Sequence, residues 1–145
     1  MAKLIATRGS QYPLVAEFTF KFDDTAVDTT GVIKDFKTVG STVVDAINLP
    51  TGAIVIGGEV VTETAVTGAT AYNVSVGDSV TAARYLAATN RVAAGRTPLV
   101  PTGYVGNGEQ IRVTVAPTVA DATAGKVTVR VQYVIRNRVN ETQTH

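Results

Sequence analysis

The chain has 145 residues, a length typical of a single domain, and its 45% hydrophobic content is enough to fill a core. The formal net charge of +1 argues against strong electrostatic binding to nucleic acid or to an anionic membrane. Cysteine is absent, which excludes a disulfide framework and a zinc–thiolate site. No run of about 18 apolar residues occurs, and the first residues lack the apolar core of a secretory signal, so we expect synthesis and folding in a cytoplasm.

The N-terminal segment, residues 1–13, shows no sustained hydrophobic period and ends at a proline. We expect an extended arm that becomes ordered against a neighbouring subunit. Its mixture of apolar and basic side chains suits such a contact, and the candidate contact residues are Lys3, Leu4, Ile5, Arg8 and Tyr12.

Residues 14–22 alternate strictly between apolar and mostly polar side chains, as a half-buried β-strand requires. The apolar face carries Leu14, Ala16, Phe18, Phe20 and Phe22. We therefore predict a strand whose three phenylalanines supply much of the aromatic core.

An acidic, turn-prone stretch follows the first predicted strand. Its carboxylates are the best candidates for a cation site, because Ca²⁺ takes several oxygen ligands. The residues are Asp23, Asp24 and Asp28, with Asp35 as a further ligand. Their spacing matches no EF-hand, and acidic turns are common without a metal, so no metal ligand is assigned.

Short strands are predicted over residues 32–36 and 43–49. A longer one covers residues 53–64, where Gly57-Gly58 marks a β-bulge or a close backbone approach. A reversal at Thr67-Gly68 leads to residues 69–76, and we expect these last two segments to form a hairpin.

The next two segments are less regular. Residues 78–90 contain helix formers behind a capping Asp78 or Ser79, so we expect one short helix or an irregular loop. Residues 91–108 hold two prolines and four glycines, which predicts a long loop between sheets. Alternation resumes over residues 110–116.

The last predicted strand, residues 126–136, has two different faces. One face carries Val127, Val129, Val131, Tyr133 and Ile135, which are typical of a sandwich core. The other is mainly polar. Together with Arg138, two residues beyond the strand, it offers three arginines that face either carboxylates on a partner or solvent: Arg130, Arg136 and Arg138.

About eight short strands with no alternation of strand and helix indicate an all-β fold, an antiparallel β-sandwich or jelly roll with at most one short helix. We expect one domain over residues 14–136, flanked by the arm (1–13) and a polar tail (137–145). Only 17% of residues are charged, which fits either a surface partly hidden in an assembly or neutral Thr and Ser on outer strand faces.

Catalytic chemistry is poorly represented in the sequence. The only histidine is the terminal His145, so Ser-His-Asp and Cys-His mechanisms are effectively excluded. Candidate carboxylate pairs come from glutamates on alternating strands or their edges, where a solvated outer face is the favoured interpretation: Glu17, Glu59, Glu63 and Glu109. We therefore expect a protein that is not an enzyme, with no catalytic residue and no cofactor.

Several stretches together resemble the capsid decoration, or cement, proteins of tailed bacteriophages. They are residues 18–24, 49–58, 76–79, 84–86 and 122–133, and they cover most of residues 18–135. The resemblance implies a β-sandwich that binds the outside of an icosahedral head and clamps adjacent subunits of the major capsid protein. It also implies a homo-oligomer, with a homotrimer favoured over a dimer, located on the virion exterior and free of catalytic residues.

Two other functions remain open from the sequence. A carbohydrate- or receptor-binding β-sandwich of a phage fibre or adhesin would show a groove lined by exposed tyrosines, with Tyr72, Tyr85 or Tyr104 as candidates. A small hydrolase with an unusual carboxylate pair is the least favoured, because the chain lacks tryptophan and an internal histidine.

Overall fold

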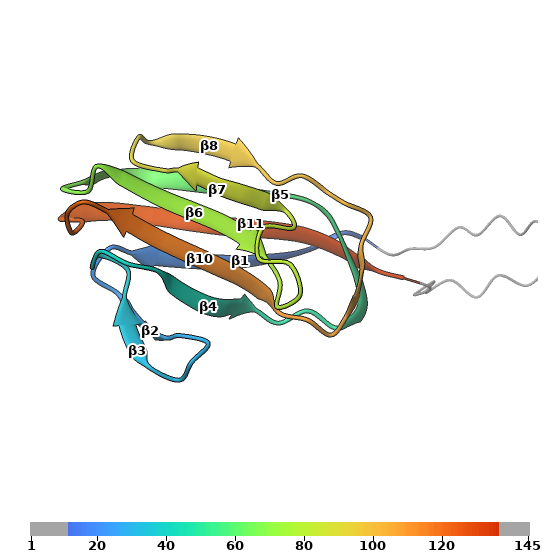
Figure 1. Ribbon diagram of the computed structural model, residues 1–145. Coiled ribbons are helices and arrows are strands. Elements are labelled where there is room, and N and C mark those ends of the chain that lie inside the picture. Colours follow the sequence, from blue (N-terminus) through green and yellow to red (C-terminus); the bar gives the residue numbers. More distant parts are fainter. Residues whose placement is uncertain (1–11, 137–145) are drawn as a thin grey trace, which may run out of the picture.

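The computed structural model describes residues 12–136, which form β-strands and connecting loops without a helix (Figure 1). The strands number eleven where the sequence indicated about eight. Their bounds are β1 (Leu14–Lys21), β2 (Thr25–Val27), β3 (Ile33–Asp35), β4 (Thr42–Ile47), β5 (Thr51–Thr67), β6 (Ala71–Gly77), β7 (Leu86–Asn90), β8 (Gly95–Pro98), β9 (Val105–Asn107), β10 (Ile111–Thr118) and β11 (Ala124–Ile135).

The strands form two sheets that face each other, and every strand pair is antiparallel. The first sheet has the order β1-β11-β5-β8, with β9 also paired to β5. The second sheet has the order β4-β10-β6-β7, and β2 and β3 make a separate hairpin beside it. The predicted all-β, antiparallel sandwich-like fold is confirmed.

The core lies between the two sheets and consists mainly of valine. Val127, Val129 and Val131 of β11 are each at most 1% exposed, as the alternation of this strand predicted. Tyr133 and Ile135, near the end of the same strand, are only half-buried. From β1, Phe20 reaches the core, where its ring lies 4.5 Å from that of Phe36 and 5.6 Å from that of Phe18.

The predicted hairpin between residues 53–64 and 69–76 is wrong. β5 pairs with β11, β8 and β9 in the first sheet, whereas β6 pairs with β10 and β7 in the second. The turn at Gly68 therefore carries the chain from one sheet to the other. Either arrangement buries the same apolar faces, so the local pattern could not distinguish a hairpin from a crossing.

Gly58 permits a close backbone approach inside the first sheet, as the Gly57-Gly58 pair predicted. Its φ angle is 139°, and a Cβ atom at this position would collide with the carbonyl of Arg130 and with the side chain of Leu99. The register of β5 against β11 also shifts at the adjacent step between Gln132 and Tyr133. A β-bulge and a close contact thus occur together.

Residues 78–90 form neither a helix nor a wholly irregular loop, because Asp78 caps a turn. Its carboxylate accepts hydrogen bonds from the N–H groups of Val80 at 2.9 Å and Thr81 at 2.7 Å. The chain then enters β7, whose Leu86 pairs with Val76 of β6. The same cap often begins a helix, but here the chain leaves the turn and becomes strand β7 instead.

The predicted long loop over residues 91–108 contains two short strands, β8 and β9, which pair with β5. Arg91 orders this segment from inside, since it is only 6% exposed. Its guanidinium donates to the Thr62 hydroxyl at 3.1 Å, to the Gly95 carbonyl at 2.6 Å and to the Thr97 hydroxyl. Pairing with the edge of β5 and hydrogen bonds to the buried Arg91 therefore order a segment that its composition predicted to be a loop.

Candidate interaction surfaces

A row of alternating charges crosses the outer face of the first sheet. Arg130 of β11 lies opposite Glu17 of β1 on one side and Glu59 of β5 on the other. Its guanidinium donates to Glu17 at 2.9 Å and to Glu59 at 3.0 Å, and Glu59 also pairs with Arg96 of β8. The hydrogen bonds to Glu17 and then Glu59 raise the pKa of Arg130. This arginine, which the sequence offered to a partner, therefore joins three strands of its own sheet.

A second polar cluster on the same face surrounds Glu63. It accepts a hydrogen bond from the buried Thr128 hydroxyl at 2.7 Å and pairs with Lys126 at 2.8 Å. Hydrogen bonding to Lys126 and Thr128 lowers the pKa of Glu63, and hydrogen bonding to Arg96 lowers the pKa of Glu59. Neither glutamate is suited to act as a general acid near neutral pH, which disfavours the hydrolase hypothesis.

The other predicted contact residues do not gather around Arg130. Tyr12, at the start of the described region, is 78% exposed. Arg136 is exposed just after β11, where its backbone N–H donates to the Gly52 carbonyl at 2.7 Å. The remaining ones, Lys3, Leu4, Ile5, Arg8 and Arg138, lie outside the described residues. The contact role of all these residues stays a prediction, as do the boundaries of the arm and the tail.

Exposed large apolar side chains concentrate in one stretch of the described chain. Of eleven such residues, seven fall within residues 12–39, on β1, on the β2–β3 hairpin and on the loop after it. We call these seven the apolar set: Tyr12, Leu14, Val15, Val27, Val32, Ile33 and Val39. Sequence reasoning named only Tyr12 of this set as a contact residue, since it placed Leu14 on the apolar face of a strand and Val27 in the turn-prone stretch. Large exposed apolar side chains are candidates for contact with a partner, and most of those described belong to this stretch.

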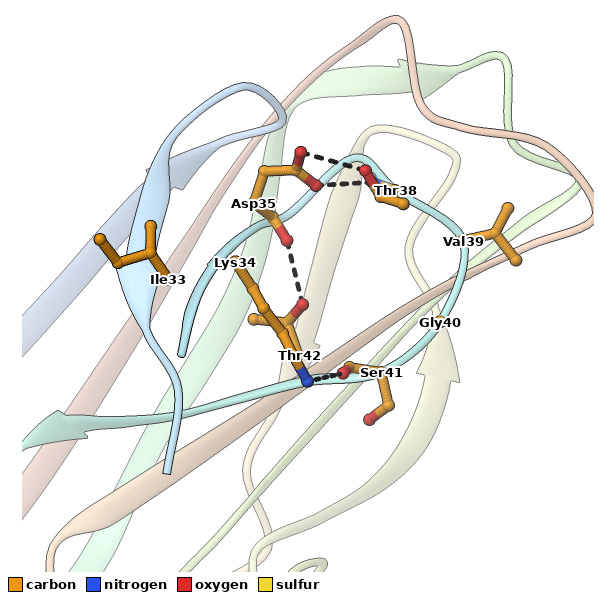
Figure 2. Close-up of a pocket in the computed structure, with 8 residues that line it drawn as sticks. All are labelled: Ile33, Lys34, Asp35, Thr38, Val39, Gly40, Ser41 and Thr42. Carbon is orange, nitrogen blue, oxygen red and sulfur yellow. Dashed lines mark hydrogen bonds between the residues drawn. The ribbon is translucent and has the colours of Figure 1, made fainter. Parts of the chain in front are cut away.

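A hollow of about 380 Å³ opens beside the β2–β3 hairpin (Figure 2). Its apolar lining comes from Ile33 and Val39, and its polar groups bond to one another. Asp35 accepts hydrogen bonds from the backbone N–H and the hydroxyl of Thr38, at 2.8 and 3.0 Å. Lys34 reaches the Ser41 carbonyl at 3.4 Å. Lys34 and Asp35 are thus engaged within the protein, while Ile33 and Val39 give the hollow apolar surface.

Asp28 fixes the conformation of the β2–β3 hairpin. Its side chain is only 3% exposed and pairs with Lys34 at 2.7 Å. It also accepts hydrogen bonds from the N–H and the hydroxyl of Thr30, at 2.9 and 2.6 Å, and from the N–H of Val32 at 3.1 Å. Lys34, followed by Thr30, holds the pKa of Asp28 far below its ordinary range. The hairpin is thus held in one shape while it presents Val27 and Ile33 to the outside.

The acidic turn is not assembled as a cation site in the structure. Asp28 points to Lys34, and Asp24 caps the chain by accepting the N–H of Lys21 at 2.8 Å. Within residues 12–136, no three His, Cys, Asp or Glu side chains are grouped so that they could hold a metal ion. No helix in this range is long and apolar enough to cross a membrane.

The tyrosine-lined groove expected of a glycan-binding module does not form from the three candidate residues. Tyr72 is 1% exposed and donates its hydroxyl to the Phe36 carbonyl at 2.8 Å, and Tyr85 is 4% exposed. Burial raises the pKa of Tyr85 to about 12. The ring of Tyr104 is covered by Arg84, whose guanidinium carbon lies 3.5 Å from the ring centroid. Two of the three tyrosines are thus buried and the third has a ring face occupied by Arg84, so they do not line a shared groove.

The carboxyl groups give a prediction for the dependence of stability on pH. Folding lowers the pKa of six of them, Asp28, Asp35, Glu59, Glu63, Asp78 and Glu109. A lowered folded-state pKa contributes stability above the ordinary value, and this contribution is lost as the pH falls through the folded-state value. The free energy of unfolding, measured with urea, should therefore be level near neutrality. It should decline as the pH drops below 4.5 and then 3.8, the ordinary pKa values of Glu and Asp. Unchanged stability down to about pH 2.5 would contradict this assignment.

Three solved structures have chains with the same fold. A chain of the cyanophage Pam1 capsid asymmetric unit matches with a TM-score of 0.62 and 24% identity, covering 92% of this chain and 94% of that one. A chain of the acidic stable capsid of Helicobacter pylori bacteriophage KHP30 matches with a TM-score of 0.61 and 20% identity, covering 92% and 95%. A chain of the capsid of Ralstonia phage GP4 matches with a TM-score of 0.55 and 13% identity, covering 99% and 93%.

No protein-family model and no curated protein matches the chain. The chain thus shares its fold, over nearly its whole length, with chains found in assembled phage capsids. At the level of the fold, this confirms the resemblance to phage capsid-associated proteins that the sequence indicated.

Proposed function

We propose that the chain is a non-enzymatic virion structural protein that binds the outer surface of a phage head. There it would stabilise the contacts between subunits of the major capsid protein, as a homo-oligomer on the virion exterior after synthesis in the host cytoplasm. The observation that carries this proposal is the shared fold with chains of three phage capsid structures, each over more than 90% of both chains. The major capsid protein is its partner, and neither nucleic acid nor a membrane is needed.

The distribution of polar and apolar groups supports a binding role without chemistry. The charged residues on the outer face of the first sheet neutralise one another, as Arg130 does with Glu17 and Glu59. The apolar set leaves side chains such as Ile33, 71% exposed, ready for contact. A capsid presents many copies of one junction, so a modest contact at each copy adds up to firm attachment. The predicted contact residues of the arm, Lys3, Leu4, Ile5, Arg8 and Tyr12, would take part in the same binding, and Arg136 and Arg138 would add charge.

Purified virions test the proposal directly. The chain should be detected in particles by mass spectrometry, and particles that lack it should release their DNA at a lower temperature. Its absence from particles, or unchanged head stability without it, would contradict the proposed function.

A matched pair of variants then tests the surface. Ile33→Asp places a charge in the apolar set, whereas Val100→Asp places one at a 63% exposed position outside it. Because an unpaired charge is costly to bury, Ile33→Asp should weaken binding of the purified chain to bare heads about tenfold or more. Val100→Asp should bind as the wild type does. Circular dichroism of both variants would show that the folds are equal.

A further inference from the structure

β1 forms the margin of the first sheet and has a long, regular outer edge. It pairs only with β11, from Leu14 opposite Tyr133 to Lys21 opposite Lys126, without a bulge. The other edge strands, β8, β7 and β4, are shorter, irregularly paired or already hydrogen-bonded on their outer side. β8 has four residues and ends in Pro98, β7 pairs irregularly with β6, and on β4 the Val43 carbonyl accepts the Thr29 N–H at 2.9 Å. A regular open edge of this kind is a template for another strand.

The hydrogen bonds of the strand show which backbone groups are open. The N–H of Phe22 donates to the Gly125 carbonyl at 3.1 Å, so even-numbered residues of β1 face β11. By the alternation of an antiparallel ladder, odd-numbered residues turn their N–H and C=O groups outward. Lys21 agrees with this, because its N–H and C=O both bond to Asp24. The backbone groups of Val15, Glu17 and Thr19 bond to nothing else within residues 12–136.

These open groups are arranged so that they match a second copy of the same strand. Pro13, four residues before Glu17, has no N–H, and Lys21, four residues after it, has an N–H that Asp24 already accepts. In an antiparallel pair centred on Glu17, Val15 faces Thr19 of the partner subunit and Pro13 faces Lys21 of the partner subunit. Every open N–H group of Val15, Glu17 and Thr19 then meets an open carbonyl of the partner strand. Pro13 and Lys21, which have no free N–H, lie opposite each other at the two ends of the pair.

We propose that two copies of the chain associate through their β1 edges, with a two-fold axis at Glu17, so that the two first sheets become one continuous sheet. The contact would cover exposed Leu14 and Val15, which belong to the apolar set. It would also bring the two Glu17 side chains together, and each is compensated by its own Arg130 at 2.9 Å. The dimer uses Leu14 and Val15 of the apolar set and leaves the members on the β2–β3 hairpin open for the proposed binding to heads. It differs from the homotrimer that the family resemblance favoured.

Disulfide trapping tests the register, because the native chain has no cysteine. In a hydrogen-bonded antiparallel pair the two Cα atoms are about 5.5 Å apart, within the range that a disulfide spans. Glu17→Cys should therefore give a disulfide-linked dimer of the full chain under mild oxidation. Lys21→Cys is the matched control on the same strand, since its two copies would lie about 27 Å apart and should not link. Equal linking of both variants, or linking of neither, would overturn the proposed register.

Proline substitution tests the edge itself. Glu17→Pro removes an outward N–H without removing a bond to β11, whereas Glu17→Ala keeps that N–H. By sedimentation equilibrium, the wild type and Glu17→Ala should be dimers, and Glu17→Pro should dissociate at least about tenfold more readily. A wild type that stays monomeric at about 50 μM, or Glu17→Pro that dimerises as the wild type does, would overturn the dimer. A monomer that still binds heads would leave the proposed function standing.

Discussion

Replacement of Phe20 by alanine is expected to lower the free energy of unfolding by about 3–5 kcal/mol, the usual range for a buried Phe→Ala change. Phe20 is 2% exposed, and its ring packs against Phe36 at 4.5 Å and Phe18 at 5.6 Å. The alanine would leave a cavity at the place where β1 meets the segment after β3. Urea unfolding followed by circular dichroism measures the loss.

The Phe20 substitution also has a structural consequence at a distance. Phe36 holds Tyr72 through a hydrogen bond from the tyrosine hydroxyl to its carbonyl, 2.8 Å long, so a shifted Phe36 would loosen β6 as well. Hydrogen exchange should therefore become faster in β6 and in the β2–β3 hairpin. Val100→Ala, at a 63% exposed position, serves as the control and should change stability by less than about 0.5 kcal/mol. If Phe20→Ala cost no more than Val100→Ala, the aromatic cluster would not be central to the fold.

The strands with strict alternation could be predicted from sequence because their physics is local. In residues 14–22 and 126–136, successive side chains must point to opposite faces, so the apolar positions identify the buried face directly. Val127 and Val129 are buried as predicted. The same logic fails at the start of β1, where Leu14 lies on the apolar face of the strand and is still 40% exposed.

The pairing of strands could not be predicted, because it depends on contacts between residues far apart in the chain. β5 and β6 are neighbours in sequence but lie in different sheets. β8 forms by hydrogen bonding to the edge of β5, and the sequence of residues 91–108 contains no sign of that distant edge. Similarly, the alternation placed Arg130 on an outer face, but its partners Glu17 and Glu59 are 113 and 71 residues away.

The apolar set was missed for a related reason. Val27 and Ile33 look like core residues by composition, and they face each other across the β2–β3 hairpin. That hairpin pairs with neither sheet, so its apolar side chains stay 60% and 71% exposed. Only the three-dimensional arrangement distinguishes a core strand from one that presents apolar residues to a partner.

Replacement of Asp78 by alanine is the second change with a large expected effect. The Asp78 carboxylate is buried and accepts hydrogen bonds from Thr81, Val80 and the Arg84 guanidinium. Burial opposes its ionisation, but these bonds, Arg84 first, outweigh burial and hold the pKa of Asp78 below its ordinary value. Arg84 in turn covers Tyr104, so the carboxylate anchors a connection between the turn after β6 and the segment before β9.

Asp78→Ala is expected to lower the free energy of unfolding by about 3 kcal/mol, because it leaves a largely buried arginine without its counter-charge. Asp45→Ala is the matched control: it removes the partner of Arg112 at 2.8 Å in an exposed pair, and should cost less than about 1 kcal/mol. Asp78→Asn should fall between the two, since its amide oxygen still accepts the turn N–H groups but carries no charge. Urea unfolding near neutral pH measures all three variants. If Asp78→Ala were no more harmful than Asp45→Ala, the Asp78–Arg84–Tyr104 connection would carry no stability, and the turn after β6 would be held by its backbone alone.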